Sequence, residues 1–338
     1  MGLEEPAGSA CDPTLPPVAV IMPILNETRH LRAAVAAVQA QDYRGPMEIV
    51  LALGPSTDDT DVIAKELAAA DPRISTVNNP TGATPCGLNA AIAASTHQIV
   101  VRVDGHAILP PDYVRIAVEV LAESGADNVG GIMAAEGVTP FEQAVARAMR
   151  SRLGIGGSRF HVGGEAGPAD TVYLGVFRRA ILEQVGGFDE SLRRAQDWEL
   201  NHRIREAGGT VWFTPRMQVT YRPRPDLPAL AKQFFRTGQW RRGVIRRMPR
   251  TANARYLAPP AVVLAVFGGT VLGLAGKRIG WLAPGGYLAV VLAGSAANAK
   301  DLDTGAAVRL PVVLATMHMA WGAGFLLSPT DLISEPDS

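Results

Sequence analysis

An aspartate and a histidine stand two residues apart at Asp104 and His106, with Gly105 between them. They follow an apolar run that begins at Ile99 and is typical of a buried β-strand. Carboxylate oxygens and imidazole nitrogens both bind divalent cations, and a turn through glycine lets two such groups reach one ion. A cation held there would neutralise charge on a departing diphosphate. The alternative is structural, with Asp104 capping the helix expected in PPDYVRIAVEVL and His106 merely packed.

A second acidic pair, Asp197 and Glu199, flanks a tryptophan in the segment QDWEL. Leu200 and Ile204 follow at helical spacing, so we expect Asp197 in the first turn of a helix. A carboxylate near the ligand edge of a sheet can accept the proton of an attacking hydroxyl group. An acid in a first helical turn is also favoured by the helix dipole alone. Both explanations stay open at this point.

Polar side chains follow two earlier apolar runs in the same way. Asn26 and Glu27 come after VAVIMPI, and Ser56 and Asp58 come after MEIVLAL. Each of them can be explained singly as a helix cap or a first-turn residue. A ligand site needs all three strand ends to lie at one edge.

The order of the elements between residues 17 and 135 predicts such an edge. The expected strands are 18–24, 47–53, 74–79 and 97–103. Helical patterns separate them, and the strands are continuously apolar instead of alternating, which indicates a parallel sheet covered on both faces. Right-handed crossovers then give a doubly wound α/β layer, which binds ligands beyond the carboxyl ends of its strands.

The overall composition excludes some classes of function. The 338-residue chain has a formal net charge of zero, which gives no general attraction for nucleic acid. Its two cysteines, Cys11 and Cys86, indicate neither a disulfide framework nor a metal cage. Residues 1–16 are acidic and proline-rich and are expected to form a flexible tail, and residues 331–338 a second tail.

The last third of the chain has a different character. Three windows, 256–276, 279–299 and 310–330, are apolar and contain no Asp, Glu, Lys or Arg. A helix of about 20 apolar residues spans a bilayer, whereas buried helices of soluble domains are shorter and keep a polar stripe. We therefore expect a membrane domain over 256–330 with about three transmembrane helices.

A cluster of arginines precedes the first window. Its members are Arg236, Arg241, Arg242, Arg246, Arg247, Arg250 and Arg255. Such a cluster marks the cytoplasmic side of a span and attracts anionic lipid headgroups. Phe234, Phe235 and Trp240 are interleaved with it, so residues 231–255 are expected to form a basic amphipathic segment in the membrane interface. The residues N-terminal to it would then be cytoplasmic.

Taken together, these segments resemble the family-two inverting glycosyltransferases with the GT-A fold. VAVIMPILNE is similar to the opening strand of that family, GPSTDDT to its nucleotide loop, VRVDGH to its Asp-x-Asp strand end and QDWEL to its acceptor-side motif. QFFRTGQW is a looser match to its Gln-x-x-Arg-Trp element. The resemblance covers about residues 17–250 and is nearest to the membrane-anchored, succinoglycan-type group.

The resemblance implies a GT-A catalytic domain over 17–230 and assigns roles within it. The implied donor-binding residues are Pro23, Asn26, Glu27, Asp58, Asn89 and Asp104. Asp104 and His106 would hold a divalent cation, Mg²⁺ or Mn²⁺, and Asp197 would be the general base. Arg236 and Trp240 would close over the diphosphate and the acceptor.

Three positions depart from the family pattern. Leu53 stands where an aspartate usually precedes the nucleotide loop, His106 replaces the second aspartate of Asp-x-Asp, and Gln196 replaces a glutamate beside the base. Leu53 bears on which nucleobase of the donor is bound, and His106 bears on how the metal ion is used.

The implied function is transfer of a sugar from a nucleotide-sugar donor to a lipid-linked, polyprenyl-type acceptor in cell-envelope or exopolysaccharide synthesis. The enzyme would be a multi-pass protein of the plasma membrane with a cytoplasmic catalytic domain. Its partners would be the donor, the lipid-linked glycan or polyprenyl phosphate, and membrane lipids. Two alternatives stay open: direct charging of polyprenyl phosphate, and a membrane-tethered nucleotide-sugar binder without activity.

Overall fold

The computed structural model describes residues 11–192, 194–330 and 332. The described chain divides into two compact units. The first consists of residues 11–133 and 164–220, and the second of residues 134–163 together with the chain from Tyr221 onward. The predicted bounds of the catalytic and membrane domains stay predictions. Most of the predicted tails, 1–10 and nearly all of 331–338, lies outside the described residues.

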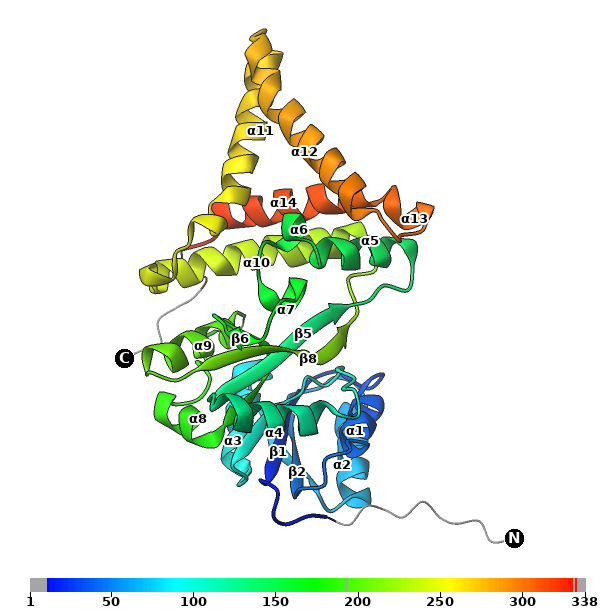
Figure 1. Ribbon diagram of the computed structural model, residues 1–338, viewed down its shortest axis with the longest axis vertical. Helices are drawn as coiled ribbons and strands as arrows, with labels where there is room; N and C mark the ends of the chain where they lie inside the picture. Colours follow the sequence, from blue (N-terminus) through cyan, green and yellow to red (C-terminus); the bar gives the residue numbers. More distant parts are fainter. Residues whose placement is uncertain (1–10, 193, 331, 333–338) are drawn as a thin grey trace, which may run out of the picture. The chain divides into compact units, whose positions relative to one another are not determined.

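An eight-stranded sheet forms the centre of the first unit within the described residues (Figure 1). Its strands lie in the order β3-β2-β1-β4-β7-β5-β8-β6. They are β1 (Val18–Ile24), β2 (Met47–Leu53), β3 (Ile74–Asn78), β4 (Ile99–Arg102), β5 (Asn128–Ala135), β6 (Gly167–Pro168), β7 (Tyr173–Arg178) and β8 (Val211–Tyr221). The four strands expected from the apolar runs are therefore present.

The first four strands pair in parallel, as predicted. Strand β1 lies between β2 and β4, with Val18 opposite both Met47 and Ile99. Strand β7 pairs with β4 in the antiparallel direction, and β5 pairs with β7 likewise. The chain moves from β1 outward to β2 and β3 and then returns to place β4 on the other side of β1. The carboxyl ends of β1 and β4 therefore form a topological switch point, where open α/β sheets bind ligands.

Helices cover both faces of this parallel half. They are α1 (Leu31–Gln39), α2 (Thr60–Ala70), α3 (Thr84–Ala94) and α4 (Tyr113–Ser124), and α8 (Arg179–Val185) and α9 (Gln196–Glu206) follow later in the unit. Val20 and Met22 of β1 join one hydrophobic core with Leu31 of α1 and Tyr113 of α4. Helix α3 packs on β1 and β2. Because side chains alternate along a strand, burial on both faces produces the continuous apolar runs seen in the sequence.

The second unit is helical. Its helices are α5 (Pro140–Met149), α6 (Arg152–Ile155), α7 (Arg159–Val162), α10 (Leu227–Arg247), α11 (Ala258–Leu274), α12 (Leu282–Asn298), α13 (Thr304–Ala307) and α14 (Leu310–Leu326), with 3₁₀ turns at Pro249–Thr251, Ala254–Tyr256 and Arg278–Trp281. Helices α11 and α12 form a hairpin that extends away from the pair formed by α10 and α14 (Figure 1).

Three helical segments of the described chain are long and apolar enough to cross a membrane. They are Ala254–Leu274, Arg278–Asn298 and Thr304–Leu326. They overlap the three apolar windows over most of their length, so the expectation of helices there is confirmed.

Candidate active site at the carboxyl edge of the sheet

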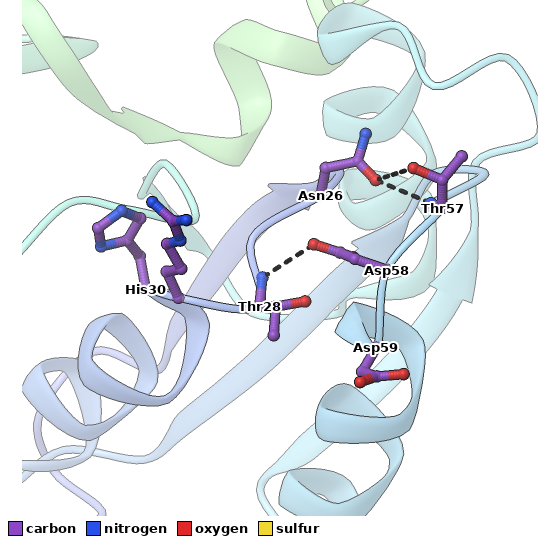
Figure 2. A pocket seen from close by; sticks show the side chains of 7 residues that line it. Asn26, Thr28, His30, Thr57, Asp58 and Asp59 are labelled. Atoms are coloured by element: carbon purple, nitrogen blue, oxygen red, sulfur yellow. Dashed lines mark hydrogen bonds between the residues drawn. The ribbon is translucent and has the colours of Figure 1, made fainter.

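The loops after β1 and β2 are bound to each other at the carboxyl edge. Asn26 adopts a left-handed backbone with φ of 55°, a conformation that asparagine tolerates better than most residues. Its side-chain Oδ1 accepts a 2.8 Å bond from the backbone N–H of Thr57, and its own N–H donates to Ser56 Oγ. Figure 2 shows Asn26 and Thr57 facing each other across the two loops. The loop after the first strand is thereby held against the GPSTDDT segment.

Asp58 provides the second tie between these loops. Its Oδ1 accepts bonds from the N–H and hydroxyl of Thr60, and its Oδ2 accepts one from the N–H of Thr28 (Figure 2). The Thr60 hydroxyl, followed by Thr28, lowers the pKa of Asp58 to about 2. Hydrogen bonds to the charged form of a carboxyl favour that form. Asp58 is therefore ionised and pinned at neutral pH.

An open pocket lies over these two loops and has a volume of about 680 Å³. Its lining consists of Asn26, Thr28, Arg29, His30, Thr57, Asp58 and Asp59. The predicted donor-binding residues Asn26 and Asp58 thus lie together in one pocket. Backbone N–H groups, an acid and a neighbouring arginine suit the hydroxyl and phosphate groups of a nucleotide.

Arg102, the last residue of β4, joins the two acids that the sequence singled out. Its Nε and Nη2 donate to Asp104 Oδ1 at 3.2 and 3.0 Å, and its Nη1 donates to Asp197 Oδ1. Only 5% of the Arg102 side chain is exposed, against 23% for Asp104 and 37% for Asp197. Arg102 thus joins its near neighbour Asp104 to Asp197, which lies 95 positions after Arg102 in the chain.

The role of Arg102 escaped the sequence interpretation, which treated it as part of a strand. The sequence nevertheless contained a signal for this role. A buried strand covered on both faces rarely contains an arginine unless an acid pairs with it. One positive and two negative charges leave this trio with a net charge of −1. Such a site favours an additional cation over an additional anion.

A second contact at this edge joins Glu27 to His106. The imidazole Nδ1 lies 2.7 Å from Glu27 Oε1. The intervening Gly105 fits because a Cβ at this position would lie 2.9 Å from the Ile24 side chain and 3.1 Å from that of Glu27. The glycine between the aspartate and the histidine therefore allows the β4 end to approach the β1 end closely.

These contacts bear on whether a divalent cation fits the site. Among the described residues, no group of three or more His, Cys, Asp and Glu side chains lies close enough to hold an ion by itself. Both Arg102 bonds to Asp104 go to Oδ1, so neither of them occupies Oδ2. The Glu27–His106 pair has the carboxylate–imidazole arrangement that orients histidine ligands of metal ions. Mg²⁺ is commonly held by one or two protein groups together with substrate phosphates. The residues therefore fit a cation that arrives with a diphosphate, with ligands from Asp104 and His106.

Asn89 is engaged elsewhere in the first unit. Its Nδ2 donates to the carbonyl of Phe188 and to Glu190 Oε1, and its Oδ1 accepts from the N–H of Phe188. These bonds fasten α3 to the segment that leads toward α9. A contact of Asn89 with a donor stays a prediction.

The helix that presents Asp197 is held by its own neighbours. Glu199 is buried and binds Arg203 through two bonds of 2.5 and 2.7 Å. Arg203 in turn donates to the carbonyls of Val185 and Gly187. The residue before the helix, Ala195, has a left-handed φ of 62°. Of the two acids in QDWEL, Glu199 thus anchors the helix, and Asp197 is the one joined to the strand end.

The remaining predicted residues are Pro23, Arg236 and Trp240. Pro23 lies within β1, opposite Ala52 of β2, one position before the strand ends. Arg236 and Trp240 lie on α10 in the second unit. Their proposed role over the diphosphate and acceptor stays a prediction.

Comparisons with known proteins agree with this fold. The profile described as Glycosyl transferase family 2 matches residues 19–186. The chain is 31% identical over 311 residues to the succinoglycan biosynthesis protein ExoA of Rhizobium meliloti, covering 90% of this chain and 93% of that protein. It is 25% identical over 232 residues to the glycosyltransferase AglE of Haloferax volcanii, covering 65% of this chain and 72% of that one.

A solved structure shares the fold over most of the chain. The mannosyltransferase PcManGT from Pyrobaculum calidifontis, determined in complex with GDP-Man and Mn²⁺, superposes with a TM-score of 0.60 and 23% identity. The match covers 96% of this chain and 90% of that structure. The expected GT-A fold is thereby confirmed. The long match to ExoA and the family profile show that this chain is a glycosyltransferase and belongs to glycosyl transferase family 2.

Proposed function

We propose that this enzyme transfers a sugar from a nucleotide-sugar donor to a lipid-linked acceptor by a single in-line displacement that inverts the anomeric centre. The observation that carries the proposal is the Arg102 bridge, because it brings the strand-end aspartate and the acceptor-side aspartate to one site. An inverting transfer needs a donor-side group and a base on the acceptor side within one site.

Asp197 takes the proton in this proposal. An acceptor hydroxyl donates its proton to the Asp197 carboxylate while its oxygen forms a bond to the anomeric carbon. The bond from that carbon to the diphosphate oxygen breaks, and its electron pair leaves with the nucleoside diphosphate. Arg102 holds the carboxylate in place through Oδ1, which fixes the direction from which the acceptor approaches.

The donor is held by the pocket between the first two loops and by the β4 end. Asn26 and Asp58 line the nucleotide part, and Asp104 lies beside the diphosphate. A divalent cation bound with the diphosphate would neutralise negative charge on the leaving group. Asp104 and His106 are the residues that would hold it, with Glu27 orienting the imidazole. The Mn²⁺ and GDP-Man in the PcManGT complex support the use of a divalent cation together with a nucleotide-sugar donor.

The acceptor is proposed to be a polyprenyl-linked glycan of exopolysaccharide synthesis. ExoA takes part in succinoglycan biosynthesis, and the second unit has apolar helices that suit a membrane. Attachment to a bilayer raises the effective concentration of a lipid-linked acceptor around the enzyme. The arginine cluster before the first apolar helix supports the predicted location of the catalytic residues at the cytoplasmic face, because such clusters mark the cytoplasmic side of a span.

The experiment is sugar transfer by the purified full chain with radiolabelled nucleotide sugars, including GDP-mannose and UDP-sugars. Each donor is offered with a lipid extract that contains polyprenyl-linked glycans and, in a parallel reaction, with polyprenyl phosphate. We expect transfer from one donor to the glycan lipid, loss of transfer with EDTA, and recovery with Mg²⁺ or Mn²⁺.

Other results would redirect the assignment. Transfer to polyprenyl phosphate alone would make the enzyme a charging enzyme of the carrier lipid. Transfer that persists in EDTA would contradict the cation role of Asp104 and His106. Donor binding without transfer to either lipid would contradict the proposed reaction and favour a binder.

A further inference from the structure

The three apolar helices of the second unit differ in how much apolar surface they expose. Helices α11 and α12, with the turn between them, expose large apolar side chains at Leu264, Phe267, Val271, Leu272, Leu274, Ile279, Trp281, Leu282, Leu288, Val290 and Leu292. Phe267 is 70% exposed and Leu274 76% exposed. Among the large apolar side chains of α14, all of which are described, Val312 alone is exposed. The hairpin therefore needs an apolar environment, which α14 finds to a greater extent within the protein.

The partner of α14 is a charged helix. Helix α10 packs along α14 (Figure 1). The two helix backbones come close together at Gly238 of α10 and at Gly324 of α14, because each glycine faces the other helix. A Cβ on Gly238 would lie 2.0 Å from the Trp321 carbonyl, and one on Gly324 would lie 1.9 Å from the Phe235 carbonyl. Helix α10 carries five arginines and one lysine in 21 residues. Because charged side chains strongly disfavour the bilayer centre, α10 cannot cross the membrane beside α14.

The carboxyl end of α14 is fixed to the charged part of α10. Arg242 donates to the carbonyls of Phe325 and Leu326 at 3.0 and 2.7 Å, and Arg246 donates to those of Ser328 and Pro329. The carbonyls of Phe325 and Leu326 belong to the last turn of α14, where C=O groups have no partners within the helix, and those of Ser328 and Pro329 follow just after it. A helix that crossed the bilayer away from α10 would carry this end to the opposite side and lose these bonds.

The amino end and the middle of α14 are held in the same layer. Helix α13, just before α14, packs on α5. Arg147 of α5 donates to the carbonyls of Asn298 and Lys300 where α12 returns. In the middle of α14, His318 Nε2 lies 2.7 Å from the carbonyl of Leu153 in α6. Both ends of α14 thus belong to one layer with α5, α6 and α10.

We propose that only the α11–α12 hairpin crosses the bilayer, and that α14 lies with α10 in the membrane interface on the cytoplasmic side. The partner of this layer is the lipid headgroup region, which suits the exposed arginines Arg236, Arg246 and Arg247 of α10. The chain then enters and returns through two spans, so the residues after α14 end on the same side as α10. This differs from three spans, which would carry them to the opposite side. The proposal is independent of the donor and the acceptor.

Cysteine labelling of the full chain in intact cells tests the topology. Cys11 and Cys86 are replaced by serine, and single cysteines are introduced as Lys232→Cys in α10, Lys277→Cys at the hairpin turn and Thr330→Cys after α14, all exposed positions. Cells are treated with a membrane-impermeant maleimide before and after permeabilisation. We expect Lys277→Cys to be labelled in intact cells, and the other two variants to gain at least about tenfold on permeabilisation.

Two outcomes would overturn the proposal. Labelling of Thr330→Cys in intact cells, to the level of Lys277→Cys, would establish three spans. Protection of Lys277→Cys in intact cells would show that the hairpin does not cross. A fusion of green fluorescent protein after Ser338 of the unaltered chain gives a second measurement, independent of the cysteine variants. A fluorescent fusion agrees with the proposal, whereas an exported, dark fusion at equal expression contradicts it.

Discussion

At the scale of single residues, the site depends on one arginine that serves two acids. Arg102 binds Asp104, which belongs to the donor side in our proposal, and Asp197, which belongs to the acceptor side. A guanidinium offers several donors in a rigid fork and can therefore hold two carboxylates in a fixed relation. Arg102 is thus a positioning residue, because it acts through the two aspartates and needs no contact with substrate.

Substituting Arg102 separates its charge from its geometry. Arg102→Met leaves two acids near each other without a partner, and we expect a loss of stability of about 2–3 kcal/mol, below the fully buried case because both acids are partly exposed. Arg102→Lys should recover most of that stability, yet transfer should stay at least about tenfold below wild type because a lysine lacks the fork. Thermal unfolding and initial transfer rates measure the two effects.

The matched control is Arg32→Met. Arg32 forms an ion pair with Glu66 in which the side chains are 57% and 56% exposed, and such pairs contribute under about 1 kcal/mol. If Arg102→Lys transferred sugar at the wild-type rate, the positioning role of the fork would be wrong.

Asp58 makes the stability of the folded state depend on pH. Its folded pKa of about 2 lies below the ordinary 3.8, because the Thr60 and Thr28 hydrogen bonds favour the charged form. A depressed carboxyl pKa stabilises the folded state above 3.8, and this contribution is lost as the pH falls from 3.8 toward 2. We expect Asp58→Asn to lower the melting temperature at neutral pH and the difference from wild type to shrink through that window.

Melting curves at a series of pH values provide the measurement. Asp59→Asn, which alters another acid of the same pocket, is the control and should show no comparable change. A difference between Asp58→Asn and wild type that stays constant down to pH 2 would contradict the assignment to the charged carboxylate.

At the scale of elements, the parallel strands were predictable, whereas the contacts between elements far apart in the sequence were not. Continuous apolar runs indicate buried parallel strands, and β1, β2 and β4 lie where those runs are, while the more polar β3 forms one edge of the sheet. The contact of β4 with α9 joins residues far apart in the sequence, and no local pattern encodes it. For the same reason the sequence pointed to Asp104 and Asp197 separately and missed Arg102, which lies between them. Asp197 and Glu199 are both first-turn acids by sequence. Only packing shows that Glu199 anchors the helix while Asp197 binds Arg102 at the strand end.

For the apolar helices, too, the sequence predicted the elements but not their packing partners. Apolar length predicted α11, α12 and α14 correctly as helices. Whether such a helix faces lipid depends on what packs beside it, and the charged α10 along α14 becomes visible only in the folded chain.

The close packing of α10 and α14 gives a prediction at this scale. In Gly324→Ala the new Cβ would lie 1.9 Å from the Phe235 carbonyl, so the helices must separate. Overpacking of this kind costs about 1–3 kcal/mol, and we expect a lower unfolding temperature in detergent micelles. The control is Gly268→Ala in α11, where a Cβ meets nothing within 4 Å, and it should stabilise the helix by about 0.5–1 kcal/mol. Equal effects of the two changes would contradict the close α10–α14 contact.

At the scale of the whole molecule, a net charge of zero conceals two chemically different units. The first concentrates acids and one buried arginine at a sheet edge, and the second combines an arginine-rich helix with an apolar hairpin. A family-two glycosyltransferase with this division can bind a soluble donor through one unit and a bilayer through the other.

The central claim is that Asp197 removes the proton from the acceptor. The most direct measurement compares wild type and Asp197→Asn in two assays on the same purified protein, donor affinity by calorimetry and turnover with saturating donor and acceptor. We predict that donor affinity stays within about twofold and that turnover falls by about 10²–10⁴-fold, the usual contribution of a general base. Turnover close to the wild-type value in Asp197→Asn, with donor binding intact, would contradict the claim and the mechanism built on it.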